Sequence, residues 1–132
     1  MSIRYKFIHN ASVYFTTSTV AGWTDIFTRE IYKTILLDCI RHCQQNHGLK
    51  IHAWVLMTNH LHTICSCKEG QDLGLKGRNI KSFTAMKLID AIINNSKESR
   101  KVTCSILLQL KLKKAAVILN TSFGNMKIIR YY

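Results

Sequence analysis

The sequence predicts an α+β domain in which an antiparallel sheet carries two helices on one face. Three observations support this prediction. β-branched and aromatic residues gather in short segments typical of strands, and apolar residues recur at helical spacing in two longer segments. These segments follow one another in the order strand, helix, strand, strand, helix. The chain has 132 residues, 47% of them hydrophobic, which is enough for one domain with a substantial core.

The first two elements are a strand and a helix. Residues 12–20 are rich in β-branched and aromatic side chains and predict the strand. Thr28 is the expected N-cap of a helix over residues 29–46, and Gly48 is its expected stop. The expected core face of this helix consists of apolar residues at helical spacing: Ile31, Ile35, Leu36, Cys39, Ile40 and Cys43.

A hairpin and a second helix complete the regular pattern. Residues 51–57 and 60–67 predict two strands joined by a tight turn at Thr58-Asn59, and the glycines of residues 68–77 predict a loop. The second helix is expected over residues 79–94, with a core face at Ile80, Phe83, Leu88, Ala91 and Ile92. This element order is that of a ferredoxin-like fold that still needs its final strand.

The formal net charge of +12 is extreme for a chain of this length. It favours a polyanionic partner, first nucleic acid and then an anionic membrane surface. No apolar run approaches the roughly 18 residues of a membrane span, and the N-terminus leads into no long apolar segment typical of a secretory signal. Five cysteines without the spacing of a disulfide scaffold predict reduced thiols in the cytoplasm.

The residues that follow Arg100 differ in character from those that precede it. All seven acidic residues precede Lys101, whereas six of the 19 basic residues lie at or after it, so this tail alone carries +6. Its apolar runs at 106–112 and 115–119 have no clean period. A basic C-terminal helix and a true change of sequence character near Arg100 are the two interpretations.

The tetrapeptide Asn59-His60-Leu61-His62 is the strongest candidate for chemistry. Side chains alternate along a strand, so His60 and His62 would share one face while Leu61 anchors the strand in the core. Two imidazoles on one face can share a divalent cation, which would polarise a phosphodiester oxygen. By itself such a pair is more often structural or incidental than a metal site, and a third ligand and a nucleophile must come from elsewhere.

The remaining candidates point mainly to packing or to a solvated surface. His42 and His47 are expected in solvent, whereas packed positions without a standard zinc spacing are expected for His52, Cys65 and Cys67. Three aromatic residues could stack on bases, although their apolar neighbours favour core packing: Trp23, Trp54 and Phe83. Three basic residues of the second helix are candidates for binding DNA phosphates: Arg78, Lys81 and Lys87.

The run AWVLMTNHLH at residues 53–62 resembles the signature of the small HUH-type single-tyrosine transposases, especially their repeat-associated (REP) tyrosine transposase branch. Three other segments resemble that family. Residues 14–19 resemble its first strand, residues 23–28 the entry to its first helix, and residues 81–85 the start of its second helix. The resemblance covers about residues 4–100.

The resemblance implies a ferredoxin-like fold and a homodimer that cleaves and rejoins single-stranded or hairpin DNA in transposition. His60 and His62 would bind a divalent metal, Mg²⁺ or Mn²⁺, on the scissile phosphate, with Asn59 as a supporting part of the motif. In that family a tyrosine on a later helix attacks the phosphate and forms a phosphotyrosine intermediate. The resemblance therefore implies a phosphoryl-transfer site made of two parts, the metal ligands and the tyrosine nucleophile.

The nucleophile of the family has no counterpart in the motifs of this chain. Two tyrosines lie in the wrong elements and two match no family motif: Tyr14, Tyr32, Tyr131 and Tyr132. A shifted reading frame over codons 120–130 can encode Tyr-Lys-Phe-Trp-Gln-His-Glu-Asn-His-Pro, which resembles the family's final strand. We therefore expect a transposase-like domain at 1–100 and a divergent basic tail at 101–132 that is out of frame and ends early. The final strand and the catalytic helix would then be altered or missing.

Three functions remain open from the sequence. The first is a transposase by descent whose altered C-terminal part impairs strand cleavage. The second is a non-catalytic DNA-binding remnant, for example a repressor of full-length transposases. The third is a ferredoxin-like RNA-binding module with incidental histidines. Loss of the final strand would expose a sheet edge and lower the stability of the domain.

Overall fold

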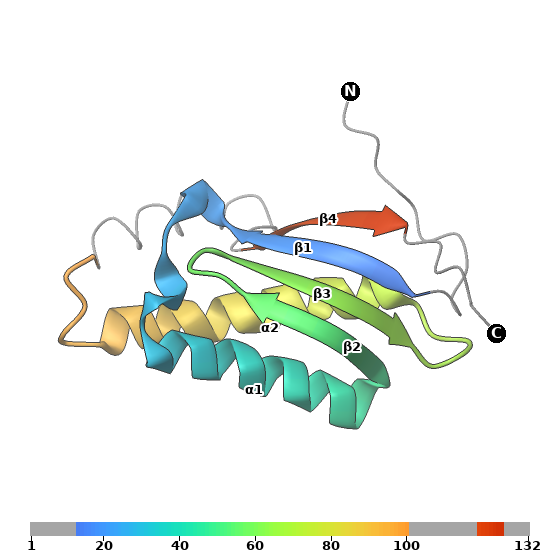
Figure 1. Ribbon diagram of the computed structural model, residues 1–132. Coiled ribbons are helices and arrows are strands. Elements are labelled where there is room, and N and C mark those ends of the chain that lie inside the picture. The colour runs from blue at the N-terminus through green and yellow to red at the C-terminus, as the bar shows by residue number, and fades with distance from the viewer. Residues whose placement is uncertain (1–12, 101–118, 126–132) are drawn as a thin grey trace.

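The computed structural model describes residues 13–100 and 119–125. Two short 3-10 turns, Ala21–Trp23 and Ile26–Thr28, connect the first strand to the first helix. The regular elements are β1 (Tyr14–Val20), α1 (Glu30–His47), β2 (Leu49–Leu56), β3 (His60–Cys67), α2 (Leu73–Asn94) and β4 (Leu119–Asn125), as labelled in Figure 1.

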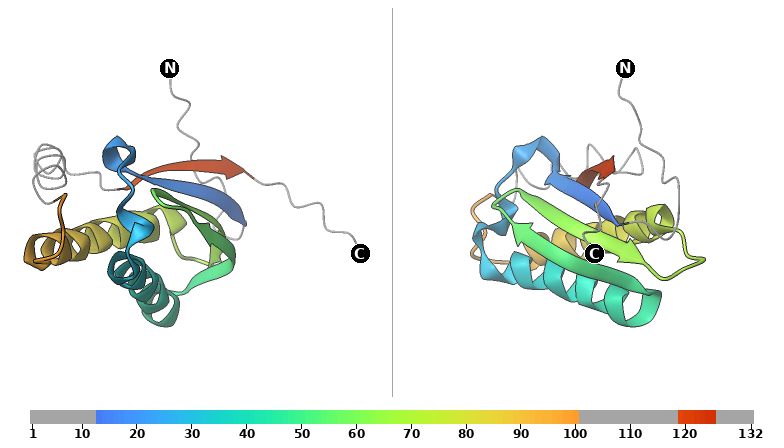
Figure 2. Two further views of the ribbon diagram at one scale, coloured as in Figure 1. Left: turned by 60° about the vertical axis from the view of Figure 1, so that its left-hand side comes forward. Right: turned by 45° about the vertical axis from the view of Figure 1, so that its right-hand side comes forward.

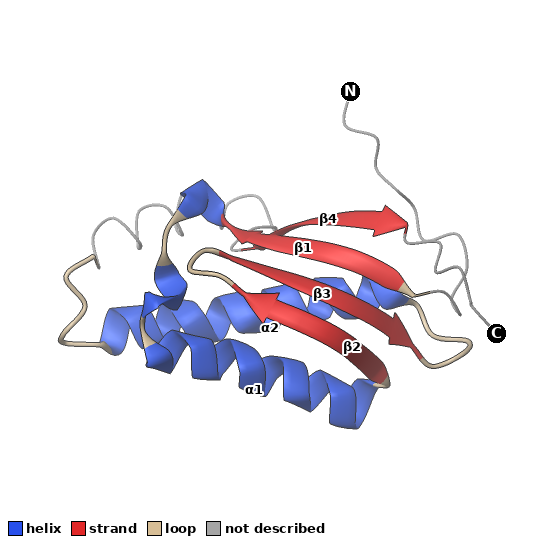
Figure 3. Ribbon diagram, in the orientation of Figure 1, coloured by secondary structure: helices blue, strands red, loops and turns tan. Residues whose placement is uncertain are grey.

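The strands form one antiparallel sheet in the order β2-β3-β1-β4, and both helices cover the same face of it (Figures 1 and 3). Figure 2 shows the same two layers, sheet and helices, from two further directions. This strand order with two helices on one face is the ferredoxin-like arrangement. The predicted α+β fold class is confirmed.

The fourth strand corrects the expectation for the tail. β4 pairs antiparallel with β1 along the whole strand, from Val20 opposite Leu119 to Tyr14 opposite Asn125. The final strand is therefore present with an altered sequence, and the edge of β1 that was expected to be exposed is paired. Backbone pairing requires no particular side chains, which is why a segment without clean alternation can complete the sheet. The prediction that the catalytic helix is altered or missing concerns residues outside the described ranges.

The core lies between the sheet and the helices. Alternate residues of β1 and β3 face the helices, so Tyr14, Leu61 and Cys65 are buried. α1 adds a buried stripe at helical spacing: Tyr32, Leu36, Cys39 and Cys43. The helix itself was predicted, but Ile31 is 50% exposed because the neighbouring Tyr32 occupies the buried position instead.

The start of α1 differs from the prediction, and its end agrees with it. Arg29 occupies the N-cap position, but its side chain makes no capping hydrogen bond to the helix. The Thr28 hydroxyl donates to Asp25 O at 3.1 Å within the preceding turn. Gly48 ends the helix in the left-handed conformation, with φ of 69°, and its N–H donates to Cys43 O. This is the backbone region in which glycine avoids the steric cost of a Cβ.

α2 begins at Leu73, six residues before the predicted start, because Asp72 caps it. Asp72 Oδ1 accepts hydrogen bonds from the backbone N–H groups of Gly74 and Leu75, at 2.8 and 3.3 Å. Leu88 and Ile92 are buried as predicted, whereas Phe83 is 45% exposed. Two of the three glycines that predicted a loop, Gly74 and Gly77, are thus tolerated inside a capped helix.

Three aromatic residues that were expected in the core are exposed. Trp23 is 69% exposed and Trp54 is 54% exposed, and Phe83 joins them on the surface. His52 was also expected to pack, but it is exposed and its Nε2 lies 2.8 Å from the Ser66 hydroxyl. Trp54 and His52 belong to the edge strand β2, and Trp23 lies in the connection after β1. The ring of Phe83 lies beside that of His42 on α1, with centroids 6.2 Å apart.

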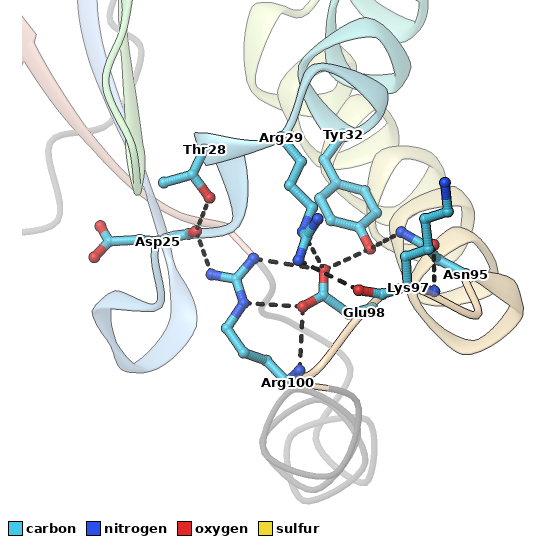
Figure 4. Close-up of polar contacts among 8 residues, drawn as sticks. All are labelled: Asp25, Thr28, Arg29, Tyr32, Asn95, Lys97, Glu98 and Arg100. Atoms are coloured by element: carbon cyan, nitrogen blue, oxygen red, sulfur yellow. Dashed lines mark hydrogen bonds and ion pairs between the residues drawn. The ribbon is translucent and has the colours of Figure 1, made fainter.

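A buried carboxylate joins the start of α1 to the residues that follow α2 (Figure 4). Glu98 is 4% exposed, and its oxygens lie 3.0 Å from Arg29 Nε and Arg100 Nε. Tyr32 donates its hydroxyl hydrogen to Glu98 Oε2 at 2.9 Å. Burial alone would raise the pKa of Glu98, but hydrogen bonds from Arg100 and Tyr32 and the charge of Arg100 lower it to about 2.

The same cluster fixes the last residues of the continuous described range. Arg100 Nη1 donates to Asp25 O at 2.7 Å, so the segment after α2 is tied to the connection between β1 and α1. Neither described helix has the length and apolar character needed to cross a bilayer. Four cysteines in the described ranges are buried: Cys39, Cys43, Cys65 and Cys67. The Cys67 thiol donates to Gln71 O at 3.1 Å.

Candidate metal and nucleic-acid site

The β2–β3 turn is held firmly against the connection between β1 and α1. Met57 N donates to His60 O at 2.8 Å, which closes the predicted two-residue turn at Thr58-Asn59. The backbone N–H groups of Val20 and Phe27 donate to the carbonyls of Asn59 and Thr58, at 2.8 and 2.9 Å. The first residues of β3 are therefore positioned by hydrogen bonds from segments distant in the sequence.

His60 and His62 lie on the face of the sheet opposite the helices. Leu61 between them is 5% exposed and belongs to the core, whereas both histidines are partly buried. The centroids of the two imidazole rings are 4.7 Å apart, and the ring planes meet at 80°. Strand alternation thus separates an anchoring residue from a pair of potential ligands, as the sequence predicts.

The Asn59 side chain determines which nitrogen of His60 carries the proton. Asn59 Nδ2 donates to Trp23 O at 3.3 Å, and since a carbonyl only accepts, the amide NH₂ must face it. Asn59 Oδ1 then faces His60 Nδ1 at 2.7 Å, so Nδ1 is the donor. The lone pair of His60 therefore resides on Nε2, the nitrogen that a metal can use.

His62 is held in a similar way from β1. The β1–β3 register places Thr17 opposite His62, and Thr17 Oγ1 lies 2.8 Å from His62 Nδ1. The ring of Phe15 stacks on the imidazole, with centroids 5.5 Å apart and planes at 17°. Each imidazole thus has its Nδ1 engaged by a neighbouring side chain, an arrangement that orients Nε2 of metal-binding histidines.

The histidine pair supplies two ligands, which fits a divalent ion shared with a phosphate. Within the described ranges, no group of three or more His, Cys, Asp or Glu side chains is placed to hold a metal. Imidazole suits Mn²⁺ and other transition ions, and water and phosphate oxygens can complete the coordination shell. The donor set does not fit a closed structural zinc site, which requires four protein ligands.

The tyrosines in the described ranges do not reach this face. Tyr14 is 3% exposed and points toward the helices, on the opposite side of β1 from Thr17. Tyr32 is fully buried, and burial is the main cause that raises the pKa of its phenol. Tyr131 and Tyr132 lie outside the described residues. The described part of the chain therefore presents candidate metal ligands without a tyrosine nucleophile beside them.

The three basic residues predicted to bind DNA lie in the other layer. Arg78, Lys81 and Lys87 belong to α2, across the sheet from the histidine pair. Burial lowers the pKa of Lys81, and the charge of Arg78 lowers it further. Lys87 Nζ lies 5.0 Å from the centre of the Phe83 ring, within cation–π range. The structure does not bring these residues together with the histidines, and their contact with DNA stays a prediction.

Sequence reasoning missed the neighbours that complete the histidine site. Thr17 and Phe15 hold His62 from β1, and the ring of Trp23 lies edge-on to His60 with centroids 6.4 Å apart. Alternation within residues 12–20 places Phe15 and Thr17 on one face, but it cannot reveal which strand lies beside β1 or in what register. The long-range pairing was the missing information.

Two solved structures are similar to this chain. A REP-associated tyrosine transposase bound to a REP hairpin matches with a TM-score of 0.58 and 22% sequence identity, over 66% of this chain and 53% of that one. The chain thus spans about half the length of that transposase. A putative transposase from Deinococcus radiodurans R1 matches with a TM-score of 0.53 and 13% identity, over 89% of this chain and 99% of that one.

No protein-family model and no curated protein matches the chain. At these identities the likeness to the two solved structures concerns the fold. The described domain, with its β2-β3-β1-β4 sheet and two helices on one face, has a fold similar to that of these transposases.

Proposed function

We propose that this protein is a single-tyrosine transposase by descent that binds single-stranded or hairpin DNA. A divalent metal, Mg²⁺ or Mn²⁺, would join a DNA phosphate to Nε2 of His60 and His62. The observation that carries the proposal is the pair of adjacent imidazoles on the face of the sheet opposite the helices, which no described helix covers and which we call the open side. Each imidazole is held at Nδ1 by a neighbouring side chain. Two further facts support it: the fold is similar to that of a transposase bound to a REP hairpin, and the net charge is +12.

Each residue of the site has a distinct task in this proposal. His60 and His62 bind the metal, and Asn59 and Thr17 keep the two rings in orientation. The metal, when bound, supplies positive charge that polarises the phosphodiester. Leu61 holds the strand in the core, so the ligands sit on a rigid element. Phosphate binding would be independent of DNA sequence, because phosphates carry no sequence information.

We further propose that the chain binds DNA without cleaving it alone. The two described tyrosines are buried away from the histidine face, which leaves no tyrosine hydroxyl of the described residues to attack the phosphate. This favours the binding protein, such as a repressor of active transposases, over an autonomous transposase. A homodimer remains part of the proposal, because the resemblance to the transposase family implies one.

The test is DNA binding with and without Mn²⁺. Fluorescence anisotropy is measured with labelled single-stranded and hairpin DNA for the wild type, His60→Ala and His62→Ala. A double variant at His42 and His47, two exposed histidines on α1, controls for loss of imidazoles in general. Mn²⁺ should tighten binding by the wild type and the control at least tenfold, and this gain should vanish in both site variants. Equal gains in all proteins would overturn the metal site.

Two companion measurements separate the alternatives. Incubation of 5′-labelled DNA with Mn²⁺ should yield neither cleavage nor a covalent protein–DNA adduct. An adduct that disappears in Tyr131→Phe or Tyr132→Phe would contradict the non-cleaving proposal. Tighter binding to RNA of the same sequence than to DNA hairpins would favour an RNA-binding module instead.

A further inference from the structure

We propose that Trp23 is a stacking platform for the nucleobase next to the phosphate held at His60 and His62. This inference rests on the proposed function and deepens it, because it assigns recognition of an unpaired base to the histidine face. It identifies the ligand as single-stranded nucleic acid with exposed bases. A duplex with all its bases stacked inside could not supply such a contact.

The exposure of Trp23 is the first observation. Its side chain is 69% exposed, the largest exposed fraction among the large hydrophobic residues of the described ranges. A Trp that does not pack into the core contributes little to folding stability. Its flat aromatic surface is nevertheless the best side-chain surface for stacking on a base.

The backbone of Trp23 is the second observation. Trp23 has φ of 55° and is the sole described non-glycine residue with positive φ. This left-handed conformation is unfavourable for a residue with a Cβ, and it is common for glycine or asparagine. Neither burial nor backbone preference therefore explains a Trp at this position. Strained residues with no structural benefit cluster at binding sites.

The third observation is the connection between Trp23 and the histidine site. The Asn59 amide donates to Trp23 O and accepts from His60 Nδ1, so one side chain fixes both the platform and the metal ligand. The Trp23 ring lies edge-on to His60 with centroids 6.4 Å apart and planes at 65°. A phosphate at the histidines would thus have its own or the adjacent base beside Trp23.

Trp54 provides a matched comparison. It is also exposed, at 54%, but it pairs with Thr63, a residue whose side chain faces the helices. Trp54 therefore lies on the other side of the sheet from the histidine pair. The chain has two Trp residues in all, so removing one leaves the other as a single fluorescent reporter.

The experiment compares two 20-nucleotide probes in Mn²⁺, oligo(dT) and an oligomer of the same length whose sites are all abasic. Both carry the same phosphates, so their affinity ratio measures what the bases contribute. Base stacking on an aromatic residue is worth about 1–3 kcal/mol, which corresponds to a preference for oligo(dT) of about 5- to 150-fold. Trp23→Ala should lose most of this preference and keep the affinity for the abasic oligomer. Trp54→Ala should behave as the wild type.

Fluorescence provides the second readout. Oligo(dT) should quench the emission of the Trp54→Phe protein, which retains Trp23, and leave that of the Trp23→Phe protein unchanged. A preference for oligo(dT) that survives in Trp23→Ala, together with Mn²⁺-dependent binding that still requires His60, would overturn the platform and leave the proposed function intact. Failure of the wild type to bind either oligomer would overturn both.

Discussion

The two sides of the sheet differ in their surroundings, since one packs against the helices and the other carries the candidate metal ligands. On the helix side, β3 contributes Leu61 and Cys65 to the core, and the helical layer is closed by the buried Glu98 cluster. On the open side, the same strand presents His60 and His62 with polar and aromatic neighbours. Because successive side chains of a strand point to opposite faces, β3 contributes to the core and also carries the candidate ligands. Substitutions on the helix side should mainly lower the free energy of unfolding, whereas substitutions on the open side should mainly weaken the proposed metal binding.

The largest expected effect on stability is that of Glu98→Gln. This change leaves the guanidinium groups of Arg29 and Arg100 without their carboxylate. Breaking a buried ion pair from one side costs about 3–5 kcal/mol. Urea unfolding at pH 7 measures the loss, and Glu69→Gln, at an exposed position, is the control. A loss for Glu98→Gln as small as that of the control would mean that the cluster does not hold the helical layer together.

Acid should remove the contribution of the Glu98 carboxylate to the stability of the fold. The pKa of Glu98 is lowered from its ordinary value of 4.5 to about 2, so the stabilisation is fully present above pH 4.5 and is lost as pH falls toward 2. A shift of this size corresponds to about 3 kcal/mol. Unfolding free energies between pH 6 and 2 should show this loss in the wild type and a shallower one in Glu98→Gln. Parallel pH profiles would contradict the assignment.

Leu61→Ala tests the helix side of β3 directly. It removes a buried side chain between the two histidines and should cost about 3 kcal/mol. His62→Ala, one residue away on the open side, should change stability by less than about 1 kcal/mol. Thermal and urea unfolding measure both. Similar losses of unfolding free energy in the two variants would contradict the claim that only the helix side of β3 stabilises the fold.

Asn59→Ala should weaken metal binding without abolishing it. The amide fixes the tautomer of His60 but supplies no ligand of its own, and loss of such a partner typically costs 10- to 100-fold in metal affinity. Mn²⁺ titration of the DNA affinity measures the effect. Asn46→Ala, which removes an amide beside His42, is the control. An unchanged Mn²⁺ dependence in Asn59→Ala would remove Asn59 from the site.

The elements with strong local signals were predicted from the sequence. The hairpin turn at Thr58-Asn59, the glycine stop at Gly48 and the alternation around Leu61 all depend on neighbouring residues alone. The early start of α2 was missed although Asp72 is a standard capping residue, because the glycines nearby outweighed it. Neighbouring residues therefore predicted an element correctly where their preferences agreed. They failed at the start of α2, where the capping residue and the glycines favoured different structures.

The missed features depend on contacts between distant segments. β4 was not predicted as a strand, because its pairing is decided by the free edge of β1. Trp23 was assigned to packing because its neighbours in sequence are apolar, whereas its exposure depends on where the 3-10 turn lies relative to β3. The roles of Thr17 and Phe15 follow from the β1–β3 register. The β1–β3 register cannot be inferred from a single sequence.

The central claim is that a divalent metal binds on the open side of β3. Paramagnetic broadening by substoichiometric Mn²⁺ in NMR spectra of the full chain tests it most directly. The account predicts that amide signals of Thr17, His60 and His62 broaden first, while signals of α2 residues such as Leu88 and Ile92 persist. The His60→Ala, His62→Ala double variant should lose this selective broadening. Broadening centred on His42 and His47, or unchanged in the double variant, would contradict the claim.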